Sequence, residues 1–390
     1  FYAPFIGKTV NGQAFPSDGT SPSDKSMWQP RLGITWDPAN DGKTVIRASG
    51  GIFYARIPGL YLASARSTNG SRLQGIFRNS ALTPFLGPVP AYPNLLPQSS
   101  VEVPDHPDVY IFDKNFRNPK TISFSIGVDR AITEDLAVSL KANYADTTQL
   151  TRYINTNDPL LGSNWSTGLP DASGGNTNGV TTLWTAESTA KSRYWGVTLG
   201  LLKKWSDNYQ FQVFYTYSQD KSDDDNERDP FKLLYAKVTD LGAEYSYSDR
   251  HQRDRFNGIF LWTAPGNINV NVRYSYRSAQ PMSLKADGTP ANTPQDRCSA
   301  LTAAGGCTAD STVTQRNLGH KDNKYSSLDF SLSRPFPVGG MVIEPILEVY
   351  NLFNSKNLRK PESGSLIFNF DGTVQSGLGD PRQAQLGVRL

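Results

Sequence analysis

The sequence has 390 residues, a net charge of +3, 37% hydrophobic residues and a mean hydropathy of −0.46. This length suffices for two or three ordinary domains or for one very large β-structure. No apolar run approaches the roughly 20 residues that a membrane-spanning helix needs, which excludes a bundle of such helices. The charges alternate along the chain and form no basic stripe, so nucleic acid is not an expected partner.

Apolar and polar residues alternate in many segments of the chain, and this period of two predicts β-strands. In one such segment, Ile122, Phe124 and Ile126 alternate with Ser123 and Ser125. Eleven strands are predicted, at 28–36, 43–55, 120–132, 136–144, 190–205, 209–219, 253–263, 268–279, 325–334, 341–354 and 382–390. Each strand has an apolar face and a polar face, so its two faces need different surroundings.

The connections between these strands alternate between short turns and long loops. The long loops are expected at about 56–119, 148–188, 220–249, 280–324 and 355–381. Outer-membrane barrels place short turns in the periplasm and long loops outside the cell, whereas soluble sandwiches and propellers have no reason for this asymmetry. The sequence therefore predicts that residues 1–390 form an antiparallel transmembrane β-barrel whose long loops are extracellular.

The number of strands bears on how such a barrel closes. If the short turns are periplasmic, the first and the eleventh predicted strand both run toward the periplasm. An odd number of antiparallel strands cannot close on itself, because its two edge strands would run parallel. We therefore expect the missing strands upstream, which makes these residues the C-terminal part of a larger barrel.

Several segments resemble the barrel of large TonB-dependent receptors of the Oar-like type. They are Trp28–Gly33, Thr44–Arg47, Gly51–Tyr54, Ser248–His251 with Arg255 and Phe256, and Asn351–Asn354. The resemblance implies a 22-stranded barrel around an N-terminal plug, of which this chain would be the C-terminal half. It also implies a TonB-type inner-membrane protein as the energy-coupling partner. The plug and the coupling segment are not part of the sequence, and the last residue is Leu390 where the family usually has an aromatic residue.

The only two cysteines, Cys298 and Cys307, lie close together in a loop rich in glycine, alanine and threonine. This spacing predicts a disulfide formed in an oxidising compartment. Two free thiols in a soluble protein are the alternative. A zinc site would need a second pair of ligands at a suitable spacing, which does not follow.

Other residues that could carry chemistry form no convincing site. The acidic run Asp223–Asp229 could hold Ca²⁺, but it lacks a glycine turn and regular ligand spacing, which favours a solvated loop. His106, His251 and His320 lie in separate segments, and no nucleophile elbow accompanies them. We therefore predict no catalytic residue, no metal and no cofactor, and place His251 near the external membrane boundary.

Charged residues on the polar faces of the predicted strands are expected to face the barrel lumen. These lumen-facing candidates are Lys141, Arg273, Arg277, Glu344 and Glu348. A polar interior either contacts a plug or lines a substrate path, and contact with a plug is the simpler interpretation. Residues that bind a ligand are not identifiable from the sequence.

The resemblance implies an outer-membrane receptor for energised uptake of a scarce ligand, with membrane lipid, plug, coupling protein and ligand as partners. A surface or adhesion protein that uses the barrel as an anchor for its loops is the alternative. A soluble extracellular β-domain that binds glycans is a third hypothesis, in which the apolar faces would meet a core instead of lipid.

Overall fold

A computed structural model describes most of the chain. The described residues are 6–7, 9–10, 13–69, 108–161, 182–225, 235–303, 305–357 and 380–390. Among them, no helix is long and apolar enough to cross a membrane.

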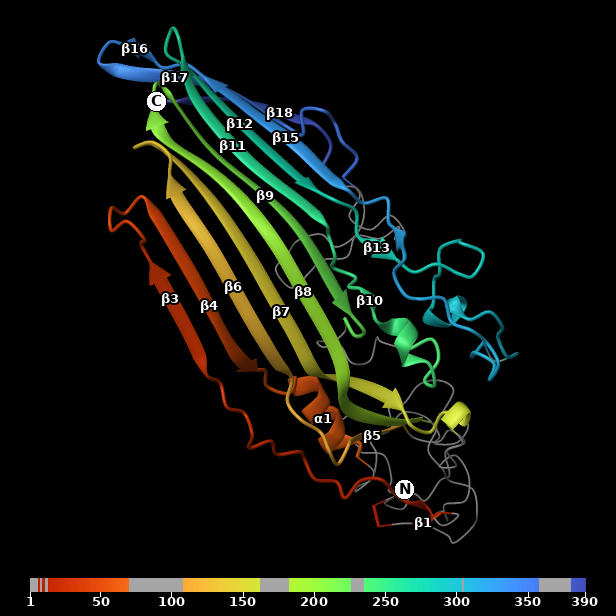
Figure 1. Cartoon of the computed structure of the whole chain (residues 1–390). Coiled ribbons are helices and arrows are strands. Elements are labelled where there is room, and N and C mark those ends of the chain that lie inside the picture. The colour runs from red at the N-terminus through yellow and green to blue at the C-terminus, as the bar shows by residue number, and fades with distance from the viewer. Residues whose placement is uncertain are drawn as a thin grey trace, which may run out of the picture.

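Eleven long strands form one curved antiparallel sheet in the described part of the chain (Figure 1). They are β3 (Arg31–Trp36), β4 (Thr44–Tyr54), β6 (Lys120–Ala131), β7 (Leu136–Asn155), β8 (Thr182–Ser206), β9 (Tyr209–Ser222), β11 (Asp254–Ala264), β12 (Ile268–Arg277), β15 (Tyr325–Ser333), β17 (Met341–Tyr350) and β18 (Gln383–Arg389). Each of them pairs with its neighbours in this order, so the eleven predicted strands are confirmed.

Shorter elements accompany these strands. They are β1 (Thr9–Val10), β2 (Gln13–Ala14), α1 (Gly59–Ser67), β5 (Asp108–Phe112), β10 (Ser246–Tyr247), β13 (Pro281–Met282), β14 (Gly319–His320), β16 (Phe336–Val338) and the 3₁₀ turns Pro159–Leu161, Leu241–Glu244 and Pro294–Arg297. In Figure 1, α1 and β5 lie at the lower centre, and β10 and β13 lie on the right, at the end of the sheet opposite the hairpin turns near β16. We call these two ends the loop side and the turn side.

The pairing register gives the sheet one apolar and one polar face. Paired residues share a face, and on one face Leu140 pairs with Leu199, which pairs with Tyr215. On the opposite face Lys141 pairs with Thr198, which pairs with Thr216. Many of the apolar side chains are exposed, Leu199 by 44% and Phe124 by 56%, so the described residues leave this face uncovered.

Aromatic residues mark both ends of the apolar face. Trp195 and Tyr217 pack together near the loop side, while Tyr209 pairs with Trp262 near the turn side, close to the exposed Trp205. Trp195 and Trp205 are ten residues apart on β8. Ten strand residues rise about 33 Å, which at a tilt of 45° spans roughly the 25 Å apolar band of an outer-membrane barrel.

The turns of the turn side are tight because their residues accept left-handed backbone. Asp207 and Asn208 have φ of 50° and 64°, and Gly339 and Gly340 have φ of 57° and 88°. Positive φ at both central residues is the requirement of a type I′ hairpin turn, whose twist matches that of the strands it joins. The Asp, Asn and Gly residues at these positions therefore explain why these two connections are only two residues long.

The loop side is larger than the sequence predicted. β7 and β8 run well beyond the predicted 136–144 and 190–205, and β5 adds to β8 as a parallel strand. A register shift near Gln149, whose φ is 61°, marks the point where β7 continues past the apolar band. Part of the predicted loops at 56–119 and 148–188 is therefore strand or helix.

Helix α1 and β5 form a small hydrophobic core with these strand extensions. Its buried residues are Tyr61, Ala65, Phe112, Phe116, Tyr153 and Ala186. Tyr61 stacks on Tyr153 with ring centroids 4.5 Å apart, and Tyr110 meets the same ring edge-on at 5.4 Å. The loop side is thus a packed structure built on the sheet.

Candidate functional site

All five lumen-facing candidates lie on the polar face of the sheet. Lys141 pairs with Gly127 and Thr198, and Arg273 pairs with Ile259 and Asp329. Arg277 pairs with Arg255 and Tyr325. Glu348 pairs with Ser331 and Gln385, and Glu344 pairs with Arg389. The structure distributes the five over β7, β12 and β17, so they form a polar wall and do not converge on one point.

Glu344 and Glu348 bind side chains of the edge strand β18. Glu344 accepts a hydrogen bond from Ser333 at 2.6 Å and forms an ion pair with Arg389 at 2.9 Å. Glu348 accepts hydrogen bonds from the amide of Gln385 and, at 3.1 Å, from the hydroxyl of Tyr350. These contacts give both carboxylates a structural role on the polar face.

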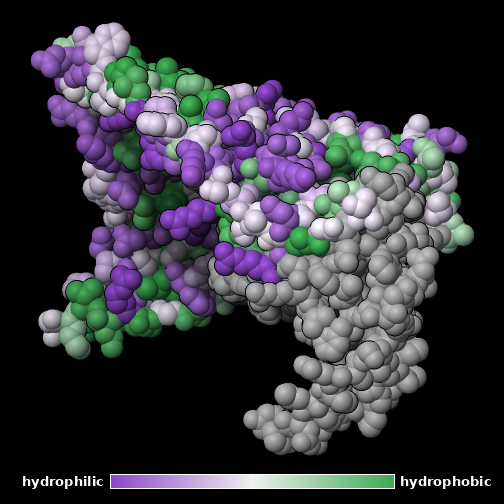
Figure 2. All heavy atoms as spheres, turned by 90° about the horizontal axis from the view of Figure 1, so that it is seen from below, coloured by the Kyte–Doolittle hydropathy of each residue, from purple (hydrophilic) through white to green (hydrophobic). Residues whose placement is uncertain are grey.

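Seen from below, the molecule is hollowed between its two edges, and many hydrophilic side chains lie along the walls of that hollow (Figure 2). Arg277 places its guanidinium 4.7 Å from the centroid of the Tyr325 ring. Arg47, on the same face, forms an ion pair with Asp129. The polar face therefore carries charges of both signs.

Beyond the polar face, a buried network of charges organises the loop side. Arg316 forms an ion pair with Asp225 at 2.8 Å, and its other terminal nitrogen donates to the carbonyl of Ser222 at 2.6 Å. Arg297 forms an ion pair with Glu244, and both side chains are 2% exposed. These pairs tie the segments before β11 and before β15 to the end of β9.

The start of the acidic run belongs to this buried structure. Asp223 lies 3.6 Å from Arg152, and Asp224 accepts a hydrogen bond from the hydroxyl of Tyr235 at 2.8 Å. Burial raises the pKa of Asp223 and raises the pKa of Tyr235 well above its ordinary value. The prediction of a solvated loop is wrong for Asp223, Asp224 and Asp225, whereas residues 226–229 lie outside the described residues.

The segment Ser248–His251, singled out by its family resemblance, takes part in the same network. The hydroxyl of Ser248 and the backbone N–H of Asp249 both donate to Asp225, each at 2.8 Å. His251 stacks on Tyr247 with ring centroids 4.6 Å apart, and its Nδ1 accepts the N–H of Asp220. Burial, with nearby cationic groups, lowers the pKa of His251.

The predicted disulfide between Cys298 and Cys307 is confirmed. Both cysteines are buried beside Ala236 and Val313, so the bond lies between two loop segments. Within the described residues, no group of three or more His, Cys, Asp or Glu side chains could hold a metal ion. His106 lies outside the described residues.

A cavity of about 530 Å³ opens beside this network, and we call it the loop cavity. Its polar wall includes Arg316, Asn317 and Asp249, with Asn317 donating to Asp249 at 2.7 Å. Its apolar wall includes Met282 and Ala291. Apart from Asp249, which lies in the Ser248–His251 segment, these residues were not identified from the sequence, because the cavity arises only when the segments before β11 and before β15 pack together.

A model of the outer membrane beta barrel domain matches residues 6–385 of the sequence. The chain belongs to that family. Its sheet is accordingly part of an outer-membrane β-barrel, and the resemblance to TonB-dependent receptors is confirmed at the level of the fold.

One solved structure supports this fold. The outer membrane transporter YddB from Escherichia coli aligns with 92% of this chain and 40% of its own, at 11% identity and a TM-score of 0.50. BauA, the ferric preacinetobactin receptor from Acinetobacter baumannii, aligns over 92% and 36% at 12% identity and a TM-score of 0.47. The chain thus spans well under half the length of these proteins. The comparison with curated proteins gives no match.

Proposed function

We propose that this chain is the ligand-capturing and lumen-forming part of an outer-membrane receptor that takes up a scarce ligand. The observation that carries the proposal is the asymmetry of the sheet. Its loop side holds a packed core, a buried charge network and a cavity of about 530 Å³, whereas its turn side holds tight hairpins. Capture on the extracellular loop side and passage along the polar face follow from this arrangement.

In this proposal the polar face lines the lumen, where Lys141, Arg273 and Arg277 meet either an N-terminal plug or the passing ligand. The plug would be supplied from upstream, and a TonB-type inner-membrane protein would supply energy from the periplasmic side. No covalent step is assigned to the barrel. The long loops 56–119, 148–188, 220–249, 280–324 and 355–381 would all be extracellular.

Uptake can be tested by filling the loop cavity. Cells that express the full-length protein would be given a defined mixture of iron(III) chelates, cobalamin, oligosaccharides and short peptides, with or without an uncoupler. We expect mass spectrometry to show one component accumulating only in energised cells. Ala291→Trp, which fills the cavity, should lower that accumulation more than tenfold, whereas Ala309→Trp on the exposed loop surface should leave it unchanged.

The alternative is an adhesion protein that uses the barrel as an anchor for the packed loop side. It predicts that no component accumulates and that Ala291→Trp reduces attachment of cells to a surface. Accumulation that is equal with and without the uncoupler would contradict energised uptake.

A further inference from the structure

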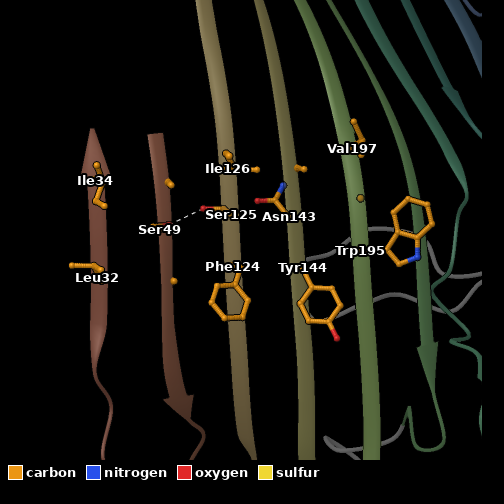
Figure 3. A pocket seen from close by; sticks show the side chains of 14 residues that line it. Leu32, Ile34, Ser49, Phe124, Ser125, Ile126, Asn143, Tyr144, Trp195 and Val197 are labelled. Atoms are coloured by element: carbon orange, nitrogen blue, oxygen red, sulfur yellow. Dashed lines mark hydrogen bonds between the residues drawn. The ribbon is translucent and has the colours of Figure 1, made fainter. Parts of the chain in front are cut away.

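An apolar groove of about 630 Å³ lies on the membrane-facing side of the sheet, across β3, β4, β6, β7 and β8 (Figure 3). Its low points are Ala48, Gly50 and Ala142, and larger residues such as Ile126 and Val197 stand beside them. Gly50 allows the ring of Phe124 to lie against the backbone, because a Cβ there would be 2.6 Å from Phe124 Cδ1. The groove therefore forms where small residues lie between larger apolar side chains on this surface.

The loop-side end of the groove is bounded by two aromatic residues with polar atoms. Tyr144 and Trp195 pair across β7 and β8, and both line the groove (Figure 3). The indole N–H of Trp195 donates to the side chain of Gln219 at 3.3 Å. Such amphipathic rings prefer the boundary between hydrocarbon and headgroups, so the groove ends at that boundary.

The next register row on the same face carries cations. Asp146 pairs with Arg193, and Arg193 pairs with Lys221. Two residues further along β8, Lys191 lies over the ring of Tyr245 at 4.6 Å, and Lys221 lies over Tyr247 at 5.5 Å. Asp146, whose carboxylate is 2.8 Å from Arg193, compensates one of the two cations in this row, so the row keeps an excess of one positive charge. On β11, Arg253 and Asp254 neutralise each other at 2.8 Å.

A single lipid molecule could occupy the apolar groove and also contact the row of cations beside it. We propose that this face binds one phospholipid whose headgroup is anionic overall, with an acyl chain in the groove and its phosphate between Arg193 and Lys221. The groove is directly continuous with the lipid-facing surface, and the cations complement an anionic headgroup at the depth where headgroups lie. The proposal does not depend on what the barrel transports.

Both Lys221 and Arg193 are available to bind a headgroup. Among the described residues Lys221 forms no ion pair, and Arg193 remains 54% exposed although it contacts Asp146. A phosphate with several acceptor oxygens can bind the free nitrogens of Arg193 while Asp146 keeps its contact with Nε. Asp146 then orients the guanidinium toward the headgroup.

The test uses the full-length protein, purified in a neutral detergent, stripped of lipid and titrated in native mass spectrometry. Palmitoyl-oleoyl phosphatidylglycerol and phosphatidylcholine are compared, because they share acyl chains and differ in headgroup charge. We expect one phosphatidylglycerol to bind at least tenfold more tightly than phosphatidylcholine. Inorganic phosphate at the same concentration should not compete, since it lacks the acyl chain.

Two kinds of variant separate the parts of the site. The double variant Arg193→Gln with Lys221→Gln should weaken binding of phosphatidylglycerol about 30-fold and abolish the preference between the lipids. Lys221→Gln alone, which breaks no ion pair of the described residues, should weaken it about fivefold. Ala142→Phe, which fills the groove, should weaken binding of both lipids.

Matched controls lie on the same face outside the site. Arg130 is an exposed cation near the turn side, and Val270 is an apolar residue on β12. Arg130→Gln and Val270→Phe should leave the affinities unchanged. Equal affinity of the unmodified protein for both lipids, or a preference that survives loss of Arg193 and Lys221, would overturn the proposal.

Discussion

Neighbouring residues on one strand of this sheet meet different surroundings, and β8 shows this most clearly. Leu199 projects from the apolar face midway between Trp195 and Tyr209, while Thr198 projects from the polar face between Lys141 and Thr216. The membrane therefore acts on individual side chains: a charge is costly at one position and tolerated at the next.

Leu199→Arg tests this at a single residue. An arginine on the lipid-facing side of a barrel near the bilayer midplane costs about 2–4 kcal/mol. We expect the free energy of unfolding of the full-length protein, measured by urea titration in phospholipid vesicles, to fall by that amount. Gln212→Arg, on the polar face of β9, should change it by less than about 1 kcal/mol. Equal losses at the two positions would contradict the assignment of the faces.

The same alternation explains what the sequence could reveal about the polar face. A period of two places Lys141, Arg273 and Glu348 on that face whatever the register, so their shared face was predictable. Their partners were not, because pairing Arg277 with Arg255 or Glu344 with Arg389 depends on how far one strand slides along the next. Turn geometry and packing fix that register.

At the scale of elements, the sequence predicted the parts of the strands that have one face toward lipid. It did not predict the parts that have protein on both faces. In Thr151–Ile154 every residue is buried, because α1 and the loop segments pack around the extension of β7. With both faces apolar or hydrogen-bonded, the period of two disappears from the sequence. The extensions of β7 and β8, and β5 beside them, were therefore missed.

Loop elements are held by charge pairs, and Arg316→Ala tests their contribution. The arginine and Asp225 are 7% and 6% exposed, and removing one partner of a buried pair costs about 3–5 kcal/mol. We expect faster amide hydrogen exchange in 241–250 and 312–318, measured by mass spectrometry on the full-length protein, with β12 unchanged. Lys324→Ala, at an exposed lysine without an ion pair among the described residues, is the control. Unchanged exchange in both segments would show that hydrophobic packing alone holds the loop side.

At the scale of the whole molecule, the fold combines an apolar belt, a polar concave wall and one elaborated end. The apolar belt follows from the alternation of apolar and polar residues along each strand, and the tight turns follow from Asn and Gly. Both are local properties that can be read from the sequence. The elaborated end depends on contacts between segments far apart in the chain, such as Arg316 with Ser222. That difference explains why the architecture was predictable while the loop cavity was not.

The orientation of the molecule in the outer membrane provides the last prediction. If the elaborated end faces outward, a short epitope inserted between Gly305 and Gly306, in the exposed part of the disulfide loop, should be bound by antibody on intact cells. An epitope between Gly339 and Gly340, in the hairpin turn that joins β16 and β17, should be bound only after the outer membrane is permeabilised. Both glycine pairs are exposed and contain a residue with positive φ, so each insertion lies at the tip of a surface turn. Antibody binding to the hairpin epitope on intact cells would reverse the orientation and place the loop cavity in the periplasm.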